Sequence, residues 1–206
     1  STIDVVRIIN KRLDTQNKKW FYIQPVFSYP SCEQNQIGVE IIDEKKVEEA
    51  IAMAIESFKT LKFNPLLQIS NINIPTLLSK KLNINIEWFK HTEIQKLLSL
   101  NIDWLKQLVY IQNATDLKKV VQNVPEFLKK EIQKIIDLAE STPYSNIIVA
   151  PLYYAKMQYY DELFFRFFEG NIVYSRGGRY LNEKQTCVGF GIYTDEIIEK
   201  LSKKVN

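Results

Sequence analysis

The sequence predicts an α+β fold: an antiparallel sheet flanked by helices, with a helical insertion in the middle at about 74–143. Segments rich in aromatic and β-branched residues gather toward the two ends of the chain, whereas the middle shows the apolar spacing of helices. Because strands and helices are segregated and do not alternate, a parallel α/β sheet is not expected. The 206 residues suffice for one sizeable domain, so a single domain is expected over 1–206.

A helix, a β-hairpin and a second helix are expected in the first third of the chain. Ser1 or Thr2 precedes a run of apolar residues at helical spacing and is the expected N-cap. Pro30 and Ser31 separate two stretches of strand character, which predicts a hairpin. Asp43 is the expected N-cap of the next helix. The elements expected up to residue 82 are a helix ending near 13, strands 20–29 and 34–42, a helix from 47 to 58, a strand 66–72 and a helix opened by Pro75.

Residues from about 87 to 141 are expected to be helical, and the chain then returns to strands. Pro125 is followed by an apolar stripe at helical spacing, which is typical of a helix packed on a core. Taken alone, Gly177 and Gly178 suit a hairpin turn, because glycine adopts the positive φ that tight turns require. Taken with Ile-Gly-Val-Glu at 37–40 and Gly-Phe-Gly at 189–191, they indicate a functional site. The expected closing elements are strands 146–150, 162–168, 172–174 and 186–192 and a helix from Thr194.

Composition excludes several classes of function. The formal charge of +3 arises from lysines scattered among glutamates without a dense arginine cluster, so nucleic-acid binding is not expected. Cys32 and Cys187 are isolated and indicate neither a zinc site nor a disulfide, which is consistent with a reducing cytoplasm. No apolar run approaches the roughly 20 residues of a membrane span and no leader opens the chain, so a soluble, cytoplasmic protein is expected.

Two segments contain motifs of a known family. Residues 20–42 have strand character, a short loop and then Gln-Ile-Gly-Val-Glu at 36–40. Residues 159–201 contain Tyr-Tyr, then Gly-Gly-Arg-Tyr at 177–180, then Gly-Phe-Gly at 189–191. This arrangement resembles the catalytic domain of class II histidyl-tRNA synthetases, whose motifs include Gln-x-Gly-x-Glu, Gly-Gly-Arg-Tyr and Gly-Phe-Gly. The resemblance implies a class II aminoacyl-tRNA synthetase-like sheet over most of the chain.

Three arginines of the synthetases are replaced in this sequence. The matching positions are Ser28, Ala155 and Glu196. In the synthetases these arginines contact ATP phosphates and the activated carboxylate, and such cations stabilise the charge that develops during attack on ATP. The chain is therefore expected not to be an enzyme and to need no cofactor. The alternative is a diverged ligase that forms an aminoacyl-adenylate.

The positions that hold histidine in the synthetases are retained better. Carried across residue by residue, the resemblance implies a histidine pocket made of Thr2, Gln36, Glu40, Tyr160 and Tyr180. Gln36 and Glu40 are four residues apart on one expected strand, so their side chains lie on the same face. If Glu40 faces the concave side of the sheet, it needs a cationic partner. That partner is either a ligand imidazolium or ammonium, or a structural arginine such as Arg166 or Arg179.

A fold that keeps the histidine pocket and lacks the ATP-binding arginines resembles the regulatory subunit of ATP phosphoribosyltransferase, a synthetase paralogue of histidine biosynthesis. The resemblance implies a non-catalytic protein that binds histidine and the catalytic ATP phosphoribosyltransferase subunit and confers allosteric feedback regulation. A paralogue that has lost its ligand and serves as a scaffold is a further alternative. The family's first motif, which forms its dimer interface, would precede Ser1 and is expected to be missing, which leaves a homodimer open.

Overall fold

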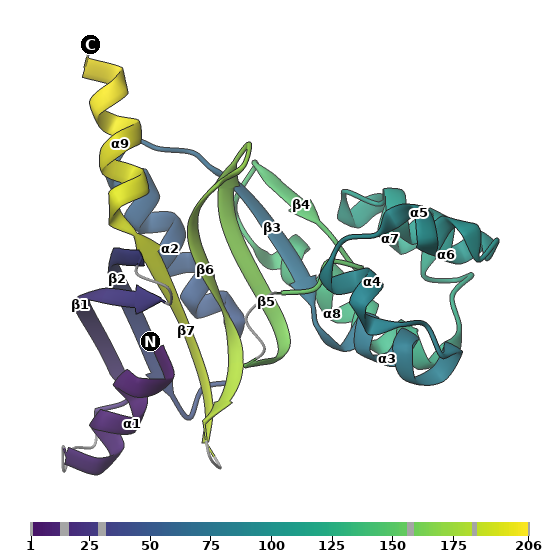
Figure 1. Cartoon of the computed structure of the whole chain (residues 1–206), viewed down its shortest axis with the longest axis horizontal. Helices are drawn as coiled ribbons and strands as arrows, with labels where there is room; N and C mark the ends of the chain where they lie inside the picture. Colours follow the sequence, from purple (N-terminus) through teal and green to yellow (C-terminus); the bar gives the residue numbers. More distant parts are fainter. Residues whose placement is uncertain (1, 13–16, 29–31, 156–158, 183–184, 206) are drawn as a thin grey trace. The chain divides into compact units, whose positions relative to one another are not determined.

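Two compact units make up the computed structural model, which describes residues 2–12, 17–28, 32–155, 159–182 and 185–205 (Figure 1). Unit 1 comprises Ser1–Leu66 and Arg166–Asn206, and unit 2 comprises Leu67–Phe165. Both ends of the chain therefore build unit 1, and the segment between them builds unit 2. The single domain expected over 1–206 remains a prediction.

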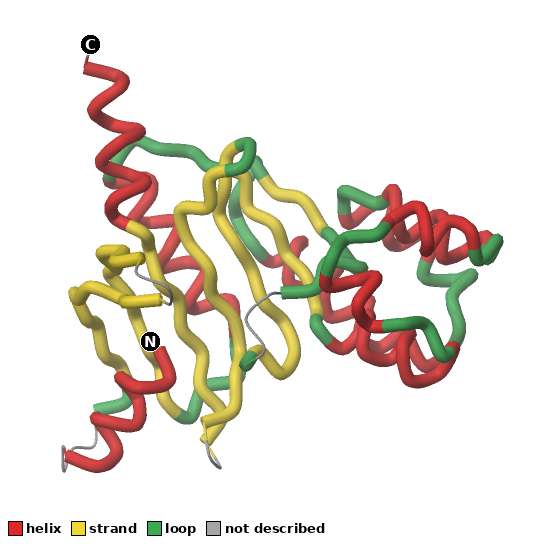
Figure 2. Tube along the Cα trace, viewed as in Figure 1, coloured by secondary structure: helices red, strands yellow, loops and turns green. Residues whose placement is uncertain are grey.

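Unit 1 is built on antiparallel strands. Its elements are α1 (Thr2–Arg12), β1 (Lys19–Ser28), β2 (Cys32–Ile42), α2 (Val47–Thr60), β6 (Ile172–Asn182), β7 (Gln185–Tyr193) and α9 (Thr194–Val205). β1 pairs with β2, β2 with β7, and β7 with β6, all antiparallel (Figure 2). The hairpin predicted around Pro30 and Ser31 is confirmed by the β1–β2 pairing, and the closing helix predicted from Thr194 is confirmed by α9.

The core of unit 1 includes the contact of α2 with β6 and β7. α2 buries residues at the spacing that its sequence predicts, namely Val47, Ala50, Ile51, Ala54, Ile55 and Phe58. Phe58 packs on Phe167 with ring centroids 4.9 Å apart, and Phe63 meets the ring of Tyr174 edge-on at 4.6 Å. Aromatic pairs at such distances add to the free energy gained from burial alone.

Unit 2 contains the helical insertion. Its elements are β3 (Leu66–Asn71), α3 (Asn73–Leu82), α4 (Ile86–Lys90), α5 (Ile94–Ser99), α6 (Asp103–Tyr110), α7 (Ala114–Val120), α8 (Glu126–Ser141), β4 (Ile147–Val149) and the first half of β5 (Tyr160–Glu169). The strand order is β1-β2-β7-β6-β5-β3-β4. β3 and β4 run parallel, so the sheet is mixed where an antiparallel sheet was expected. The helices between these two strands form the long crossover that a parallel pair requires.

Asparagines divide the insertion into short helices. The side-chain oxygens of Asn85 and Asn113 accept the backbone N–H of Glu87 at 3.0 Å and of Asp116 at 2.8 Å and so cap α4 and α7. Asn83 follows α3 with a φ of +53°, a left-handed conformation that asparagine tolerates.

Among the described residues, each helix is too short or too polar to span a membrane.

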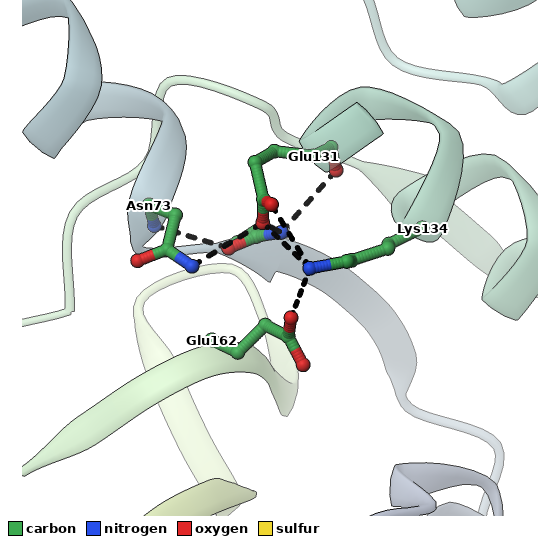
Figure 3. A network of polar contacts seen from close by, with 5 residues as sticks. Asn73, Glu131, Lys134 and Glu162 are labelled. Atoms are coloured by element: carbon green, nitrogen blue, oxygen red, sulfur yellow. Dashed lines mark hydrogen bonds and ion pairs between the residues drawn. The ribbon is translucent and has the colours of Figure 1, made fainter. Parts of the chain in front are cut away.

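A partly buried polar network joins elements of unit 2 (Figure 3). The Glu131 carboxylate accepts hydrogen bonds from the side-chain amides of Asn71 at 2.9 Å and Asn73 at 3.2 Å. Lys134 donates to Glu131 at 2.9 Å and also to Glu162 of β5. Burial opposes ionisation of Glu131, but these hydrogen bonds outweigh it and lower the pKa of its carboxyl. The same two ion pairs outweigh burial at Lys134 and raise the pKa of its ammonium.

Two expectations about local structure are wrong. Asp43 does not cap α2: it has a φ of +58°, and Lys46 occupies the N-cap position. The Glu44 carboxylate accepts the backbone N–H groups of Lys45 and Lys46 and so fixes the intervening residues. Gly177 and Gly178 do not form a hairpin turn, because β6 continues through them and pairs them with Phe190 and Gly189.

Candidate ligand-binding site

One face of the sheet in unit 1 brings glycines and polar side chains together. Gln36, Gly38 and Glu40 alternate along β2, so all three lie on one face. Residues directly opposite one another in the β1–β2, β2–β7 and β6–β7 pairs share that face. We call it the glycine face, and the members used below are Tyr22, Gln36, Gly38, Glu40, Arg176, Gly178, Tyr180, Gly189, Gly191 and Tyr193.

Glu40 and Tyr180 form a buried pair on this face. Both residues have an exposed fraction of 0%, and the Tyr180 hydroxyl donates to Glu40 Oε2 at 2.6 Å. Burial raises the pKa of the neighbouring Cys187 thiol to about 11, and the Glu40 carboxylate acts in the same direction. A tyrosine thus supplies a donor where a ligand cation or an arginine was expected. Arg179 adjoins Tyr180 on β6 and therefore belongs to the opposite face.

Gln36 and Tyr22 form a second polar pair. The Gln36 side chain is 9% exposed, and its Nε2 donates to the Tyr22 hydroxyl at 2.7 Å. Tyr22 lies on β1 directly opposite Gly38. Tyr22 was not predicted, because the expected strands 20–29 and 34–42 do not fix the register that pairs it with Gly38.

The glycines make room for these side chains. A Cβ on Gly189 would lie 2.0 Å from Glu40 Oε2, and a Cβ on Gly191 would lie 1.9 Å from Gln36 Nε2. A Cβ on Gly38 would lie 2.2 Å from the Tyr22 ring. The polar side chains of β1 and β2 therefore lie over glycine backbone, where any larger residue would displace them.

An arginine that the sequence analysis did not single out also belongs to this face. Arg176 lies directly opposite Gly191. Its Nη1 donates to the Tyr193 hydroxyl at 3.1 Å, and its guanidinium carbon lies 5.6 Å from the centre of the Tyr193 ring. The signal for it was the alternation of Arg176, Gly178 and Tyr180 along a strand, which the predicted turn concealed.

The structure brings together Gln36, Glu40 and Tyr180 among the predicted pocket residues. Tyr160 belongs to unit 2, where its ring stacks on Phe164 at 5.4 Å and packs in a cluster with Ile72 and Ala155. Thr2 begins α1, which contacts β2, β6 and β7, but its side chain lies outside the described residues, as does the cap expected from Ser1. The roles assigned to Thr2 and Tyr160 stay predictions.

The replaced arginine positions contain no cation. Ala155 is a buried member of the apolar cluster in unit 2, and Glu196 lies in the first turn of α9. Beside Glu196, the Asp195 carboxylate accepts the backbone N–H of Asn35 at 2.7 Å, which fastens the start of α9 to β2. Two carboxylates at a helix N-terminus stabilise the helix but repel an anion such as a nucleotide phosphate. The Ser28 side chain lies outside the described residues.

Unit 2 contains an apolar cavity of about 180 Å³. Aromatic and aliphatic side chains such as Trp88, Phe89 and Leu108 line it, together with Thr92. Such a lining offers few groups that could orient a polar ligand. The glycine face, with its carboxylate, amide, hydroxyl and guanidinium groups, is the better candidate for a specific site.

Two bacterial proteins resemble this chain along almost its whole length. A protein of Wolinella succinogenes, named ATP phosphoribosyltransferase regulatory subunit, is 46% identical over 204 residues, which cover 98% of this chain and 71% of the relative. A protein of Helicobacter hepaticus with the same name is 40% identical over 203 residues, which cover 98% of this chain and 72% of the relative. No model of a protein family matches the chain.

Solved structures share the fold at lower identity. A Bacillus halodurans protein described as an ATP phosphoribosyltransferase regulatory subunit/histidyl-tRNA synthetase matches with a TM-score of 0.77 and 18% identity, over 95% of this chain and 62% of its own. A chain of an ATP phosphoribosyl transferase (HisG:HisZ) complex from Thermotoga maritima matches with a TM-score of 0.69 and 17% identity, over 94% and 79%. The class II aminoacyl-tRNA synthetase-like fold expected from the motifs is confirmed.

Proposed function

Because this chain belongs to the family of ATP phosphoribosyltransferase regulatory subunits, we propose that it binds histidine on the glycine face and docks on the catalytic ATP phosphoribosyltransferase subunit, whose activity it adjusts. In this role the chain is non-catalytic and cytoplasmic, and it confers feedback inhibition by histidine. The observation that supports the proposal most strongly is the buried Glu40–Tyr180 pair beside Gln36.

The chemistry of this pair suits an imidazole ring. A carboxylate accepts hydrogen bonds only, and the ring nitrogens of histidine are donors when protonated. In a buried setting a charge-assisted bond from an imidazole N–H to Glu40 is stronger than the same bond in water. The Gln36 amide and the Tyr22 hydroxyl, joined at 2.7 Å, supply further donors and acceptors on the same face. The glycine face can therefore fix a ligand at more than one polar group.

The replacement of arginine at three positions supports a role without catalysis. Ser28, Ala155 and Glu196 stand where the synthetases use cations, and a carboxylate at position 196 raises the energy of a bound phosphate. Removing one donor of this kind costs an enzyme about 2.7–4 kcal/mol of transition-state stabilisation. Three such losses together argue against adenylate formation.

A catalytic partner is supported by the Thermotoga maritima structure, which is described as a complex of ATP phosphoribosyl transferase. For this chain we propose a partner of the same class. Histidine would then act by binding one state of the assembly more tightly than another, because a ligand shifts an equilibrium only through such a difference in affinity.

Calorimetric titration of the chain with histidine tests the binding site. We expect saturable binding by the wild type and a loss of about 1–3 kcal/mol in the Glu40→Gln variant, since the substitution removes a charged acceptor. Glu56→Gln is the matched control: Glu56 is an exposed carboxylate of α2, 3.8 Å from Lys59, and its loss should leave affinity unchanged. Equal affinity in wild type and Glu40→Gln would remove the proposed site, and no binding in either would leave the scaffold alternative.

A further inference from the structure

We infer that Arg176 is the residue of the glycine face that binds the α-carboxylate of the amino-acid ligand. This inference rests on the proposed function, since it deepens the account of the same site. The pocket residues carried over from the synthetases, Thr2, Gln36, Glu40, Tyr160 and Tyr180, include no cation. An amino acid has a carboxylate, and an ionised carboxylate taken out of water requires a charged or multiple hydrogen-bond partner. The glycine face supplies that partner at position 176.

The register places Arg176 beside the other polar groups. Arg176 lies directly opposite Gly191, and the Gln36 amide lies over the same glycine, because a Cβ there would be 1.9 Å from Gln36 Nε2. The guanidinium and the amide therefore approach Gly191 from the two neighbouring strands, β6 and β2. Because Gly191 has no side chain, both groups can lie close to its backbone.

Tyr193 orients the guanidinium. Its hydroxyl accepts a hydrogen bond from Arg176 Nη1 at 3.1 Å, and its ring faces the guanidinium carbon at 5.6 Å. Tyr193 lies opposite Gln36 on the same face. It is buried, so neighbouring atoms restrict the movement of its side chain. A planar guanidinium held in this way presents its donors in a fixed fork, the geometry that matches a carboxylate.

The two charged ends of the face are spaced for one small ligand. Glu40 and Tyr180 meet beside Gly189, whereas Arg176 and Gln36 meet beside Gly191, two residues further along β7. At a rise of about 3.4 Å per residue, the two ends are roughly 7 Å apart. An amino acid with a short ring-bearing side chain can reach both ends, with its ring at Glu40 and its carboxylate at Arg176. At each end the face and the ligand then have opposite charges: Glu40 faces the protonated ring, and Arg176 faces the carboxylate.

The nearby arginines do not fit this role. Arg179 belongs to the opposite face of β6, because it adjoins Tyr180 in an extended strand. The guanidinium carbon of Arg166 lies 4.4 Å from the centre of the Phe168 ring on β5. Among the described strand positions that form the glycine face, the cationic one is Arg176.

A comparison of two ligands in three proteins tests the inference by calorimetry. The ligands are histidine and histamine, which has the imidazole and the amine but no carboxylate. The proteins are the wild type, Arg176→Gln and the control Arg179→Gln on the opposite face. We expect Arg176→Gln to weaken histidine binding by roughly tenfold or more and to leave histamine binding unchanged, because only histidine has the group that Arg176 binds. Arg179→Gln should bind both ligands as the wild type does.

Each other outcome is decisive. If Arg176→Gln binds histidine as tightly as the wild type, or if its affinity falls by the same factor for histidine and histamine, Arg176 does not bind the carboxylate. That result overturns this inference and leaves the proposed histidine site standing. If the wild type binds no histidine, the inference and the proposed site both fail. Should Arg176→Gln fail to fold, as judged by its circular dichroism spectrum, Arg176→Lys replaces it. Lysine keeps the positive charge but lacks the fork of donors. Arg176→Lys should therefore prefer histidine over histamine less strongly than the wild type does.

Discussion

Glu40 shows how neighbouring residues make a buried carboxylate tolerable in a sheet. The Tyr180 hydroxyl reaches it at 2.6 Å, and Gly189 leaves the space in which its Oε2 lies. Spacing along β2 correctly placed Gln36 and Glu40 on one face. Tyr22 and Arg176 were not predicted, because their roles depend on pairing partners that local sequence does not specify.

At Gly189 and Gly191, alanine substitutions should differ in their effect. A Cβ on Gly189 would meet the backbone oxygen of Val39 at 2.6 Å as well as Glu40, whereas the atoms near a Cβ on Gly191 belong to the flexible Gln36 side chain. We expect Gly189→Ala to lower the free energy of unfolding by about 1–3 kcal/mol through overpacking. Gly191→Ala should lower it less but still weaken histidine binding. Urea denaturation checks the order, and equal stability of the two variants would contradict it.

Cys187 should be chemically inert in the native state. It is buried beside Glu40, and its thiol pKa of about 11 leaves little thiolate at neutral pH. In a Cys32→Ser variant we expect the remaining thiol to react with an aromatic disulfide reagent only after unfolding in denaturant. Labelling at the rate of a free thiol without denaturant would show that this part of the glycine face opens readily.

At the scale of elements, pairing partners decide what local pattern leaves open. Gly177 and Gly178 have the composition of a turn, yet they lie inside β6, where the β7 ladder outweighs the weak strand preference of glycine. β3 and β4 were both expected as strands, but their parallel pairing depends on the path of the helices between them. By contrast, the α2 and α8 stripes were predictable, because helical periodicity is a local property.

The Glu131–Lys134 network should make unit 2 sensitive to acid. The folded-state pKa of Glu131 is lowered, so its contribution to stability is present above the unfolded pKa of about 4.3 and is lost as pH falls through the folded value. We expect Glu131→Gln to lower the free energy of unfolding by about 1–2 kcal/mol at pH 7, with the difference from wild type shrinking below about pH 4.

The control for this prediction lies on the same helix. Glu126 pairs with Lys129 at 2.7 Å with the same spacing as Glu131 and Lys134, but its side chain is 86% exposed. Glu126→Gln should change stability by less than about 0.5 kcal/mol at either pH, as exposed ion pairs contribute little. Chemical denaturation of both variants between pH 3 and pH 7 makes the comparison. A loss in Glu131→Gln that does not vary with pH would contradict the assignment.

At the scale of the whole molecule, the motifs predicted the class II synthetase-like fold, and the comparisons confirm it. The five carried-over pocket residues are a different case. Gln36, Glu40 and Tyr180 lie on one face of unit 1, and the roles of Thr2 and Tyr160 stay predictions. Motif order reports common ancestry well, but the convergence of side chains depends on packing that motifs do not encode.

The chain should not activate amino acids. Without cations at Ser28, Ala155 and Glu196, the charge that develops during attack on ATP has lost its stabilisation. We expect histidine-dependent exchange between ATP and pyrophosphate to stay at buffer background. Exchange above that background, abolished by Glu40→Gln, would instead establish the diverged ligase.

The central claim is that histidine on the glycine face controls a catalytic partner. The most direct measurement is the activity of the catalytic ATP phosphoribosyltransferase subunit against histidine concentration, alone, with the wild-type chain and with Glu40→Gln. With the wild-type chain present, we expect the activity of the catalytic subunit to fall as the histidine concentration rises. With Glu40→Gln, the histidine concentration that gives half-inhibition should be about fivefold higher or more, because the variant binds histidine more weakly. Identical curves with and without the chain, or with wild type and Glu40→Gln, would contradict the account.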